Sequence, residues 1–258
     1  MTPLTAEASR HVLDWLGPDA GPGRLPLRHA LLHDRPGLWG DDSRRPESVL
    51  LFRPGDGQSE AFGAGRPGPA VNFLARQAGR IALLAPSAWE GDVIAAVGPV
   101  VGYGLVVTLL DPDRVPRRPP APIPVRRLVA EDAAAFAAAS PPWALRSWDS
   151  YQEMYASGAA FGVPLGDALA SVAWVYEEDE ASDAVGIHTL PKYRRLGLGR
   201  AAASALLSHI VADRGKSPLW ITSADDAGSL SLAASLGFSS RVAETLLRWP
   251  VPEDEEKG

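Results

Sequence analysis

The sequence predicts a mixed α/β protein with two domains. Apolar runs of strand length alternate with segments of helical spacing in residues 48–110 and again in residues 168–248. Short turns such as Gly-Asp-Gly at residues 55–57 join several strands, which favours hairpins over the parallel strands of a doubly wound sheet. A run of prolines at residues 112–124 favours an extended spacer and separates the two regions.

These observations predict four segments along the chain. They are an α/β domain at residues 1–111, a proline-rich linker at 112–124, a second domain at 125–250 and an acidic tail at 251–258. Both domains have the element order hairpin, helix, strand, helix, strand. We therefore hypothesise an ancient duplication, in which the smaller N-terminal half is a degenerate copy.

Local signals place the elements of the first domain. Ser87, with Glu90 three residues later, predicts a capping box at the start of a helix. Residues 17–47 are rich in Gly, Pro and Arg and predict irregular structure. The predicted elements are a helix at 6–16, a hairpin at 48–65, a helix at 70–79, a strand at 80–86, a helix at 87–97 and a buried strand at 100–110.

The second domain has clearer boundaries. Leu198, Ala202, Leu206 and Ile210 follow helical spacing in a long helix that ends at Gly215. Asp225 or Asp226 is the expected N-cap of the last helix. The other predicted elements are a strand at 124–130, helices at 130–140 and 143–158, three strands within 159–190, a strand at 218–223 and a last strand at 242–249.

Composition excludes several classes of function. The chain has no cysteine, so it forms no disulfide and has no thiolate nucleophile. A net charge of −6 argues against nucleic-acid binding by bulk electrostatics. No signal-peptide pattern or membrane-length apolar run is present, so we expect a cytoplasmic protein without membrane contact. His29 and His33 have a spacing that can bind metal, but no third ligand is near, and we predict no metal site.

The sequence PKYRRLGLGRAAA at residues 191–203 predicts an anion site. It follows a predicted strand and begins the long helix, where backbone N–H groups lack partners and the helix dipole is positive. Gly197 and Gly199 let the backbone approach a ligand closely, and the arginines add forked donors. Together these features favour a bound pyrophosphate.

Two classes of pyrophosphate ligand fit this turn. GLGRAA matches the Gly-x-Gly-x-x-Ala pattern of dinucleotide-binding proteins, but that motif normally follows its strand within a couple of residues. Here PKYRR intervenes, and the preceding strands read as antiparallel. The strand order thus disfavours an NAD site. The second class is coenzyme A, which a family resemblance supports.

The turn resembles the cofactor signature of the GNAT acyltransferases, Gln/Arg-x-x-Gly-x-Gly/Ala after Val/Thr-x-Pro. Arg194, Gly197 and Gly199 occupy the signature positions. A second family pattern follows downstream at the expected spacing, at Asp226, Ser229, Leu232, Ala233, Gly237 and Phe238. The resemblance covers residues 125–249 and is greatest to the subgroup of zwittermicin-resistance acetyltransferases, which also have an extra N-terminal half.

The resemblance implies a GNAT fold, whose mostly antiparallel sheet splays open after the fourth strand between flanking helices. It also implies acetyl-CoA as acyl donor, with strand-like hydrogen bonds from Thr189 and Leu190 to the thioester arm. The pyrophosphate would lie on amides of residues 195–201. The implied cofactor-binding residues are Thr189, Leu190, Arg194, Arg195, Leu196, Gly197, Leu198, Gly199, Arg200, Ala201 and Ser229.

Catalysis has two candidate bases, Asp183 and His188. Asp183 lies near the position of a catalytic glutamate in some family members, and His188 has a suitable intrinsic pKa. Glu177 is better interpreted as a surface charge. The family's acidic tyrosine is replaced by Ala233, so another hydroxyl, such as Ser229 or Tyr193, would have to act.

The predicted function is transfer of an acetyl group from acetyl-CoA to a primary amine by direct attack in a ternary complex. The acceptor is a small molecule or a peptide, and the sequence leaves a homodimer open. Because the tyrosine is absent, a non-catalytic acyl-CoA-binding or scaffold protein is the alternative.

Overall fold

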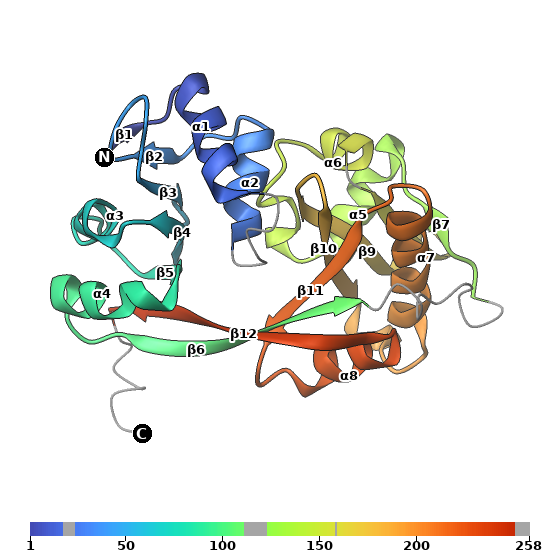
Figure 1. Cartoon of the computed structure of the whole chain (residues 1–258). Helices are drawn as coiled ribbons and strands as arrows, with labels where there is room; N and C mark the ends of the chain where they lie inside the picture. The colour runs from blue at the N-terminus through green and yellow to red at the C-terminus, as the bar shows by residue number, and fades with distance from the viewer. Residues whose placement is uncertain (18–23, 111–122, 158, 251–258) are drawn as a thin grey trace. The chain divides into compact units, whose positions relative to one another are not determined.

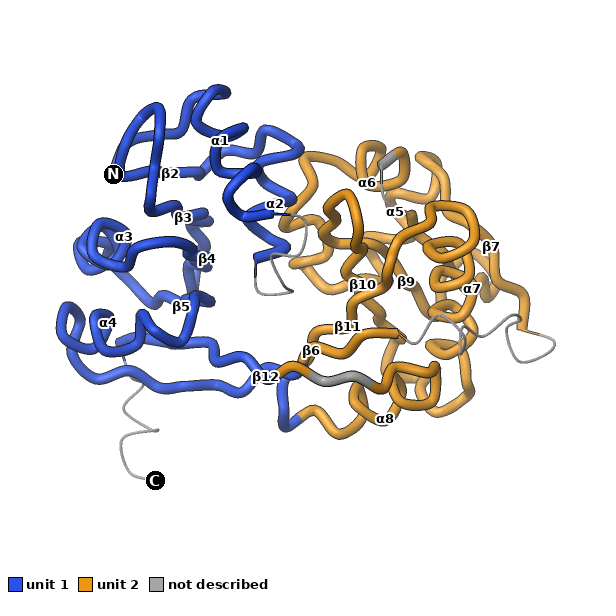
Figure 2. Tube along the Cα trace, viewed as in Figure 1, with its two compact units in different colours: residues 1–106, 223–225, 243–258 blue, residues 107–222, 226–242 orange. Residues whose placement is uncertain are grey.

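The computed structural model describes residues 1–17, 24–110, 123–157 and 159–250. Figure 2 shows the chain divided into two compact units. Unit 1 contains residues 1–106, 223–225 and the chain from Ala243, and unit 2 contains residues 107–222 and 226–242. The predicted linker lies outside the described residues except for Ile123 and Pro124, and the predicted acidic tail lies outside them entirely.

Unit 1 is an α/β unit whose strands follow the order β1-β2-β3-β4-β5 (Figure 1). Beyond β5 the sheet continues with the C-terminal end of β12, which pairs antiparallel with β5. Its elements are β1 (Thr2–Pro3), α1 (Ala6–Leu16), α2 (Leu25–Leu32), β2 (Leu38–Gly40), β3 (Ser48–Arg53), β4 (Ser59–Gly65), α3 (Pro67–Leu74), β5 (Ile81–Leu84), α4 (Glu90–Val97) and the first part of β6 (Val101–Leu110).

Two expectations for unit 1 were wrong. The region predicted as irregular contains α2 and β2, whose residues are largely buried, because apolar packing overrides the local Gly and Pro content. Ser87 does not cap a helix with its side chain. Instead Ser87–Trp89 form a 3₁₀ turn that leads into α4, and neither element has a side-chain cap hydrogen bond.

Unit 2 has the strand order β6-β11-β10-β9-β8-β7 (Figure 1). In the predicted helical segment 143–158, a 3₁₀ turn, Pro142–Leu145, precedes a short helix. Its elements are β7 (Arg126–Arg127), α5 (Ala133–Ala139), α6 (Tyr151–Ser157), β8 (Ala160–Leu165), β9 (Ala168–Glu178), β10 (Ser182–Thr189), α7 (Leu198–Ala212), β11 (Ser217–Ser223), α8 (Ala227–Ser235) and the first part of β12 (Phe238–Trp249).

Helices cover both faces of the unit 2 sheet. Helix α7 packs on one face through its apolar stripe, in which Ala202, Leu206 and Ile210 are fully buried as predicted. Each large apolar side chain contributes about 1.5–3 kcal/mol by leaving water. On the opposite face Phe136 of α5 contacts the ring of Trp174 on β9, with 5.6 Å between centroids. The strands between these layers therefore present one set of side chains to α7 and the alternate set to α5.

The central parallel strands of unit 2 pair over only part of their length. Strand β10 pairs with β11 from Ser182 to Ala184 and then parts from it, while its pairing with β9 continues to Thr189. In unit 1, β4 and β5 are likewise parallel and pair only from Ser59 to Phe62. Both units thus contain a hairpin, helix, strand, helix and strand around one partly opened parallel pair.

Strands β6 and β12 each have one end in unit 1 and the other end in unit 2. Residues 101–106 of β6 belong to unit 1, and residues 107–110 belong to unit 2. Conversely, β12 begins in unit 2 and enters unit 1 at Ala243. The compact units are therefore not two consecutive stretches of sequence.

Candidate active site

Beyond Ala184, no strand of the described residues covers one backbone edge of β10. The Leu190 N–H donates to Ala170 O at 3.0 Å, and the Ser171 hydroxyl donates to His188 O at 3.1 Å, so these groups face β9. Successive residues of a strand direct their backbone groups to opposite edges. The N–H and C=O groups of Ile187 and Thr189 therefore lie on the edge from which β11 has separated.

The turn after β10 presents backbone donors to solvent. The first helical bond of α7 runs from Ala201 N to Gly197 O at 3.0 Å. Among the described residues, the N–H groups from Gly197 to Arg200 have no backbone acceptor. Helix starts with such free donors, at the positive end of the dipole, bind anions. The exposed arginines 194, 195 and 200 add cationic charge to the same turn.

Backbone geometry explains the residues of the turn. Gly197 has φ +79° and Arg195 has φ +65°, so the chain passes twice through the left-handed region. The Arg194 Nε–H donates to Thr189 O at 3.1 Å and ties the turn to the end of β10. A Cβ at Gly199 would lie 3.0 Å from Thr189 Oγ1, so a larger residue there would require the Thr189 side chain to shift.

The structure brings most of the predicted cofactor residues together, with three qualifications. The Leu190 N–H donates to Ala170 O, and the Leu190 C=O accepts the Tyr193 N–H. The Ala201 N–H is also engaged within α7. Ser229 lies on α8, where its hydroxyl accepts the Trp220 Nε1–H at 2.9 Å. Sequence reasoning missed Ile187, although its place two residues before Thr189 on one strand indicated the same edge.

His188 lies on the face of the sheet covered by α5. Its Nδ1 is 2.8 Å from Ala139 O. A carbonyl oxygen can only accept a hydrogen bond, so Nδ1 carries the proton. In the neutral ring Nε2 is then the basic nitrogen.

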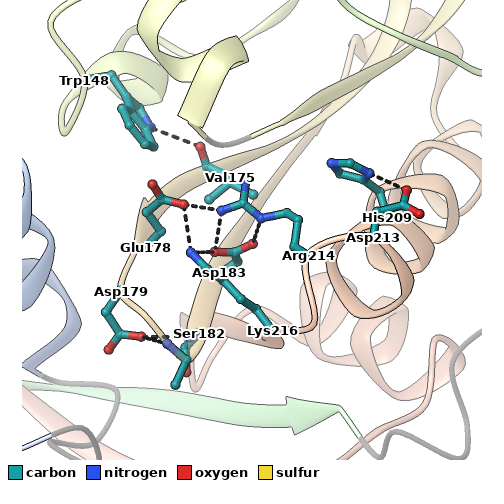
Figure 3. A network of polar contacts seen from close by, with 11 residues as sticks. Trp148, Val175, Glu178, Asp179, Ser182, Asp183, His209, Asp213, Arg214 and Lys216 are labelled. Atoms are coloured by element: carbon teal, nitrogen blue, oxygen red, sulfur yellow. Dashed lines mark hydrogen bonds and ion pairs between the residues drawn. The ribbon is translucent and has the colours of Figure 1, made fainter.

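Asp183 lies in a buried ion-pair network on the α7 face, which Figure 3 shows. Its carboxylate is fully buried and contacts Arg214 Nε at 2.6 Å and Lys216 Nζ at 3.2 Å. Glu178 pairs with the same two cations, at 3.0 Å from Lys216 Nζ. Burial raises the pKa of the Asp183 carboxyl, and attraction to Arg214 and Lys216 opposes this rise.

The two candidate bases cannot act on the same atom. Five residues separate them on β10, so their side chains lie on opposite faces and ~16 Å apart along the strand. Glu177 is fully buried and accepts the Ser147 hydroxyl at 2.8 Å, which contradicts its interpretation as a surface charge. The turn after Glu178 is held by Asp179, whose Oδ1 accepts the N–H groups of Ala181 and Ser182.

Three further features of the described residues concern metal binding, membrane insertion and the cap of α8. His29 and His33 stack with 4.5 Å between ring centroids, and no group of metal-ligating side chains occurs in the described part of the chain. In that part, no helix has the length and apolarity needed to cross a membrane. Asp226 caps α8, since its Oδ1 accepts the Ser229 N–H at 2.8 Å, which confirms one of the two predicted caps.

In unit 1 the Trp89 side chain lies where β4 and β5 separate, the region that corresponds to the separated strands β10 and β11 of unit 2. The Trp89 Nε1–H donates to Gly65 O at 2.9 Å, at the end of β4 where β5 has already separated. A Cβ at Gly63 would lie 2.4 Å from the Trp89 ring. The following helix begins with Pro67 and also contains Pro69, which have no N–H to offer an anion.

The fold and this site define a class of protein. A mostly antiparallel sheet whose parallel central strands separate beside an anion-binding helix start is the GNAT fold, as predicted. Residues 123–245 match the model of the GNAT acetyltransferase family.

Two similar proteins were also found. An uncharacterized N-acetyltransferase from Streptomyces virginiae, encoded in the mutA 5′ region, is 29% identical over 202 residues, which cover 77% of this chain and 83% of the relative. A GCN5-related N-acetyltransferase-like protein from Streptococcus suis has a TM-score of 0.71 at 21% identity, with 95% of this chain and 99% of that chain covered.

The whole chain also resembles a tandem arrangement of two such units. A tandem GNAT protein from the clavulanic acid biosynthesis pathway has a TM-score of 0.66 at 14% identity, and the match covers 97% of this chain and 99% of that chain. At this identity the likeness concerns the fold alone. It agrees with the repeated element order seen in units 1 and 2.

Proposed function

We propose that this protein transfers an acetyl group from acetyl-CoA to a primary amine by direct attack. One observation carries the proposal. The uncovered edge of β10 leads directly into a turn with free N–H groups from Gly197 to Arg200 and three exposed arginines. An extended arm can form strand-like bonds with Ile187 and Thr189, and a pyrophosphate can bind the turn.

His188 is the base that we propose for the amine. An amine with an ordinary lysine-like pKa is almost fully protonated at pH 7, and removing its proton costs ~4.6 kcal/mol. The Nε2 atom can accept that proton because Nδ1–H is held by Ala139 O. Asp183 is assigned a structural role, since Arg214 and Lys216 already engage its carboxylate on the other face.

Two further groups complete the mechanism. The N–H of Ile187 or Thr189, on the free edge of β10, can stabilise the oxyanion that develops when the amine attacks the thioester. The leaving thiolate has an ordinary pKa near 8.5, by analogy with cysteine, and so requires little help from an acid. Ser229 can donate its hydroxyl hydrogen, because its oxygen already accepts the Trp220 N–H.

One observation favours an alternative. Ala233 occupies the position of the family's acidic tyrosine and is 1% exposed, so no side chain replaces that hydroxyl from the same place. A non-catalytic acyl-CoA-binding or scaffold protein would retain the turn and lose the acid. Membership of the zwittermicin-resistance subgroup is likewise a proposal, based on the sequence resemblance and the extra N-terminal unit.

The decisive experiment follows thiol release from acetyl-CoA with a panel of small amines and peptides, together with calorimetric binding of acetyl-CoA. We expect micromolar binding and amine-dependent release. His188→Ala should lower kcat about 10²-fold, while Asp183→Asn should leave the kcat of the folded enzyme unchanged. Binding without release for any amine would favour the alternative, and no binding would refute the cofactor assignment.

A further inference from the structure

A buried pair of hydroxyl groups lies beside the uncovered edge of β10. Ser171, on β9, is fully buried, and its cross-strand partner is Thr189, the last residue of β10. The Ser171 hydroxyl donates to His188 O at 3.1 Å, and Ser171 Oγ lies 2.8 Å from Thr189 Oγ1. A hydroxyl has one hydrogen, so Ser171 gives its hydrogen to the carbonyl, and the Thr189 hydroxyl donates to Ser171.

The Ser171 hydroxyl holds a peptide group whose other side faces the edge. The His188 C=O and the Thr189 N–H belong to one planar peptide unit, in which the two groups point in opposite directions. Because Ser171 binds the carbonyl on the side of β9, the Thr189 N–H points to the edge that no strand of the described residues covers. A hydrogen bond to the carbonyl also polarises the peptide and makes its N–H a stronger donor.

Thr189 is also held from the side of the anion-binding turn. The Arg194 Nε–H donates to Thr189 O at 3.1 Å, so this C=O is engaged and the N–H is the backbone group that Thr189 offers to a ligand. A Cβ at Gly199, in the first turn of α7, would lie 3.0 Å from Thr189 Oγ1. The Thr189 N–H therefore lies at the end of the edge that adjoins the anion-binding turn.

We propose that Ser171 is a positioning residue for the pantetheine arm of the cofactor. Its hydroxyl aims the Thr189 N–H at a carbonyl oxygen of the arm close to the phosphates, and leaves the Ile187 N–H for the thioester at the far end of the arm. Ser171 acts through this peptide and needs no contact with the cofactor. The inference rests on the proposed acetyl-CoA site, because it names a residue that supports that site, and it can be tested without turnover.

The test measures the binding of two ligands by calorimetry. One is acetyl-CoA, and the other is adenosine 3′-phosphate 5′-diphosphate, which has the phosphates of CoA but no arm. We expect Ser171→Ala to weaken acetyl-CoA binding about 3- to 10-fold, the range that corresponds to the loss of one neutral hydrogen bond. Binding of the armless ligand should stay within about 2-fold of wild type, because the N–H groups and arginines of the turn are unchanged.

Ser204→Ala is the matched control. Ser204 is fully buried on α7 of the same unit, and its hydroxyl has no hydrogen-bond partner among the described residues. This variant should bind both ligands as wild type does. If Ser171→Ala also binds acetyl-CoA like wild type, or loses affinity for both ligands by the same factor, the inference is wrong while the proposed function stands. Absence of acetyl-CoA binding to the wild-type protein would instead refute the proposed function.

A double-mutant cycle tests the link between the two hydroxyls. Thr189→Val keeps the shape of the side chain and removes the hydroxyl that donates to Ser171. Because both residues act in one hydrogen-bonded cluster, the loss of affinity in the double variant should be smaller than the product of the two single losses. Independent losses would contradict the inference. With an amine that turns over, Ser171→Ala should raise KM for acetyl-CoA and leave kcat within about 2-fold of wild type, since binding of the arm is the step affected.

Discussion

Loss of one cation from the Asp183 network should destabilise the fold and leave the chemistry intact. In Arg214→Met, a side chain of similar reach replaces the guanidinium that lies 2.6 Å from Asp183. Two buried carboxylates, of Asp183 and Glu178, then lose one of the two cations that they share and keep Lys216. Removing one partner from a buried ion pair costs 3–5 kcal/mol, and since Arg214 retains 14% exposure, we expect ~3 kcal/mol. That corresponds to a Tm lower by ~6–12 °C.

The loss should depend on pH in a defined direction. Burial already raises the pKa of Asp183, and without the opposing guanidinium the pKa rises further. A folded-state pKa above the unfolded value means that protonation favours folding. The stability penalty is therefore largest above the raised pKa and shrinks as the pH falls through it.

Urea unfolding followed by tryptophan fluorescence at pH 7.5 and pH 5.5 measures both effects. Arg66→Met is the matched control, because Arg66 and Glu47 form an ion pair at 2.9 Å with side chains 75% and 61% exposed. Such a surface pair contributes only ~0–1 kcal/mol. If Arg214→Met unfolds like this control, or if its loss is the same at both pH values, the reasoning fails.

Three further predictions concern single positions. Gly186→Ala places a Cβ 2.6 Å from the Trp174 ring and should lower the free energy of unfolding by ~1–3 kcal/mol. Gly91→Ala, in open space on α4, should instead raise the free energy of unfolding. Thermal unfolding of the two variants compares these effects directly. Arg195→Gly should stabilise the fold by ~0.5–1 kcal/mol, because relief of the positive φ exceeds the cost of the added backbone entropy. The same substitution should weaken acetyl-CoA binding, because it removes a cation. A more stable variant with unchanged affinity for acetyl-CoA would contradict the proposed role of Arg195. Calorimetry should give one bound acetyl-CoA per chain, because Trp89 fills the opened strand pair of unit 1, and two equivalents would disprove that interpretation.

The sequence predicted the parts of the site that depend on local chemistry. Gly197 at positive φ and the N–H groups without backbone acceptors among the described residues follow from a glycine-rich turn at a helix start, so the geometry of this turn could be predicted. The equal weighting of Asp183 and His188 was avoidable, since positions five apart on a strand lie on opposite faces. The partners of Asp183 could not be predicted, because Arg214 follows a whole helix and meets β10 only in the tertiary structure.

Helix α2 illustrates a second limit. Its segment looked irregular because Gly, Pro and Arg dominate the surrounding residues, yet Leu27, Ala30 and Leu31 are buried in a core shared with α1 and β3. Tertiary burial supplies most of the stability of short helices, and one sequence does not contain that information in local form.

Strand β12, which begins in unit 2 and ends in unit 1, affects how this chain can fold during synthesis. Most of unit 1 precedes unit 2 in the sequence, but β5 receives its antiparallel neighbour only from Leu246–Trp249. During synthesis the sheet of unit 1 therefore remains one strand short until all of unit 2 and residues 246–249 have been translated. An early stop codon would leave the edge of β5 uncovered, and such an edge recruits strands from other chains. A fault at the last strand would thus appear as misfolding of the first domain.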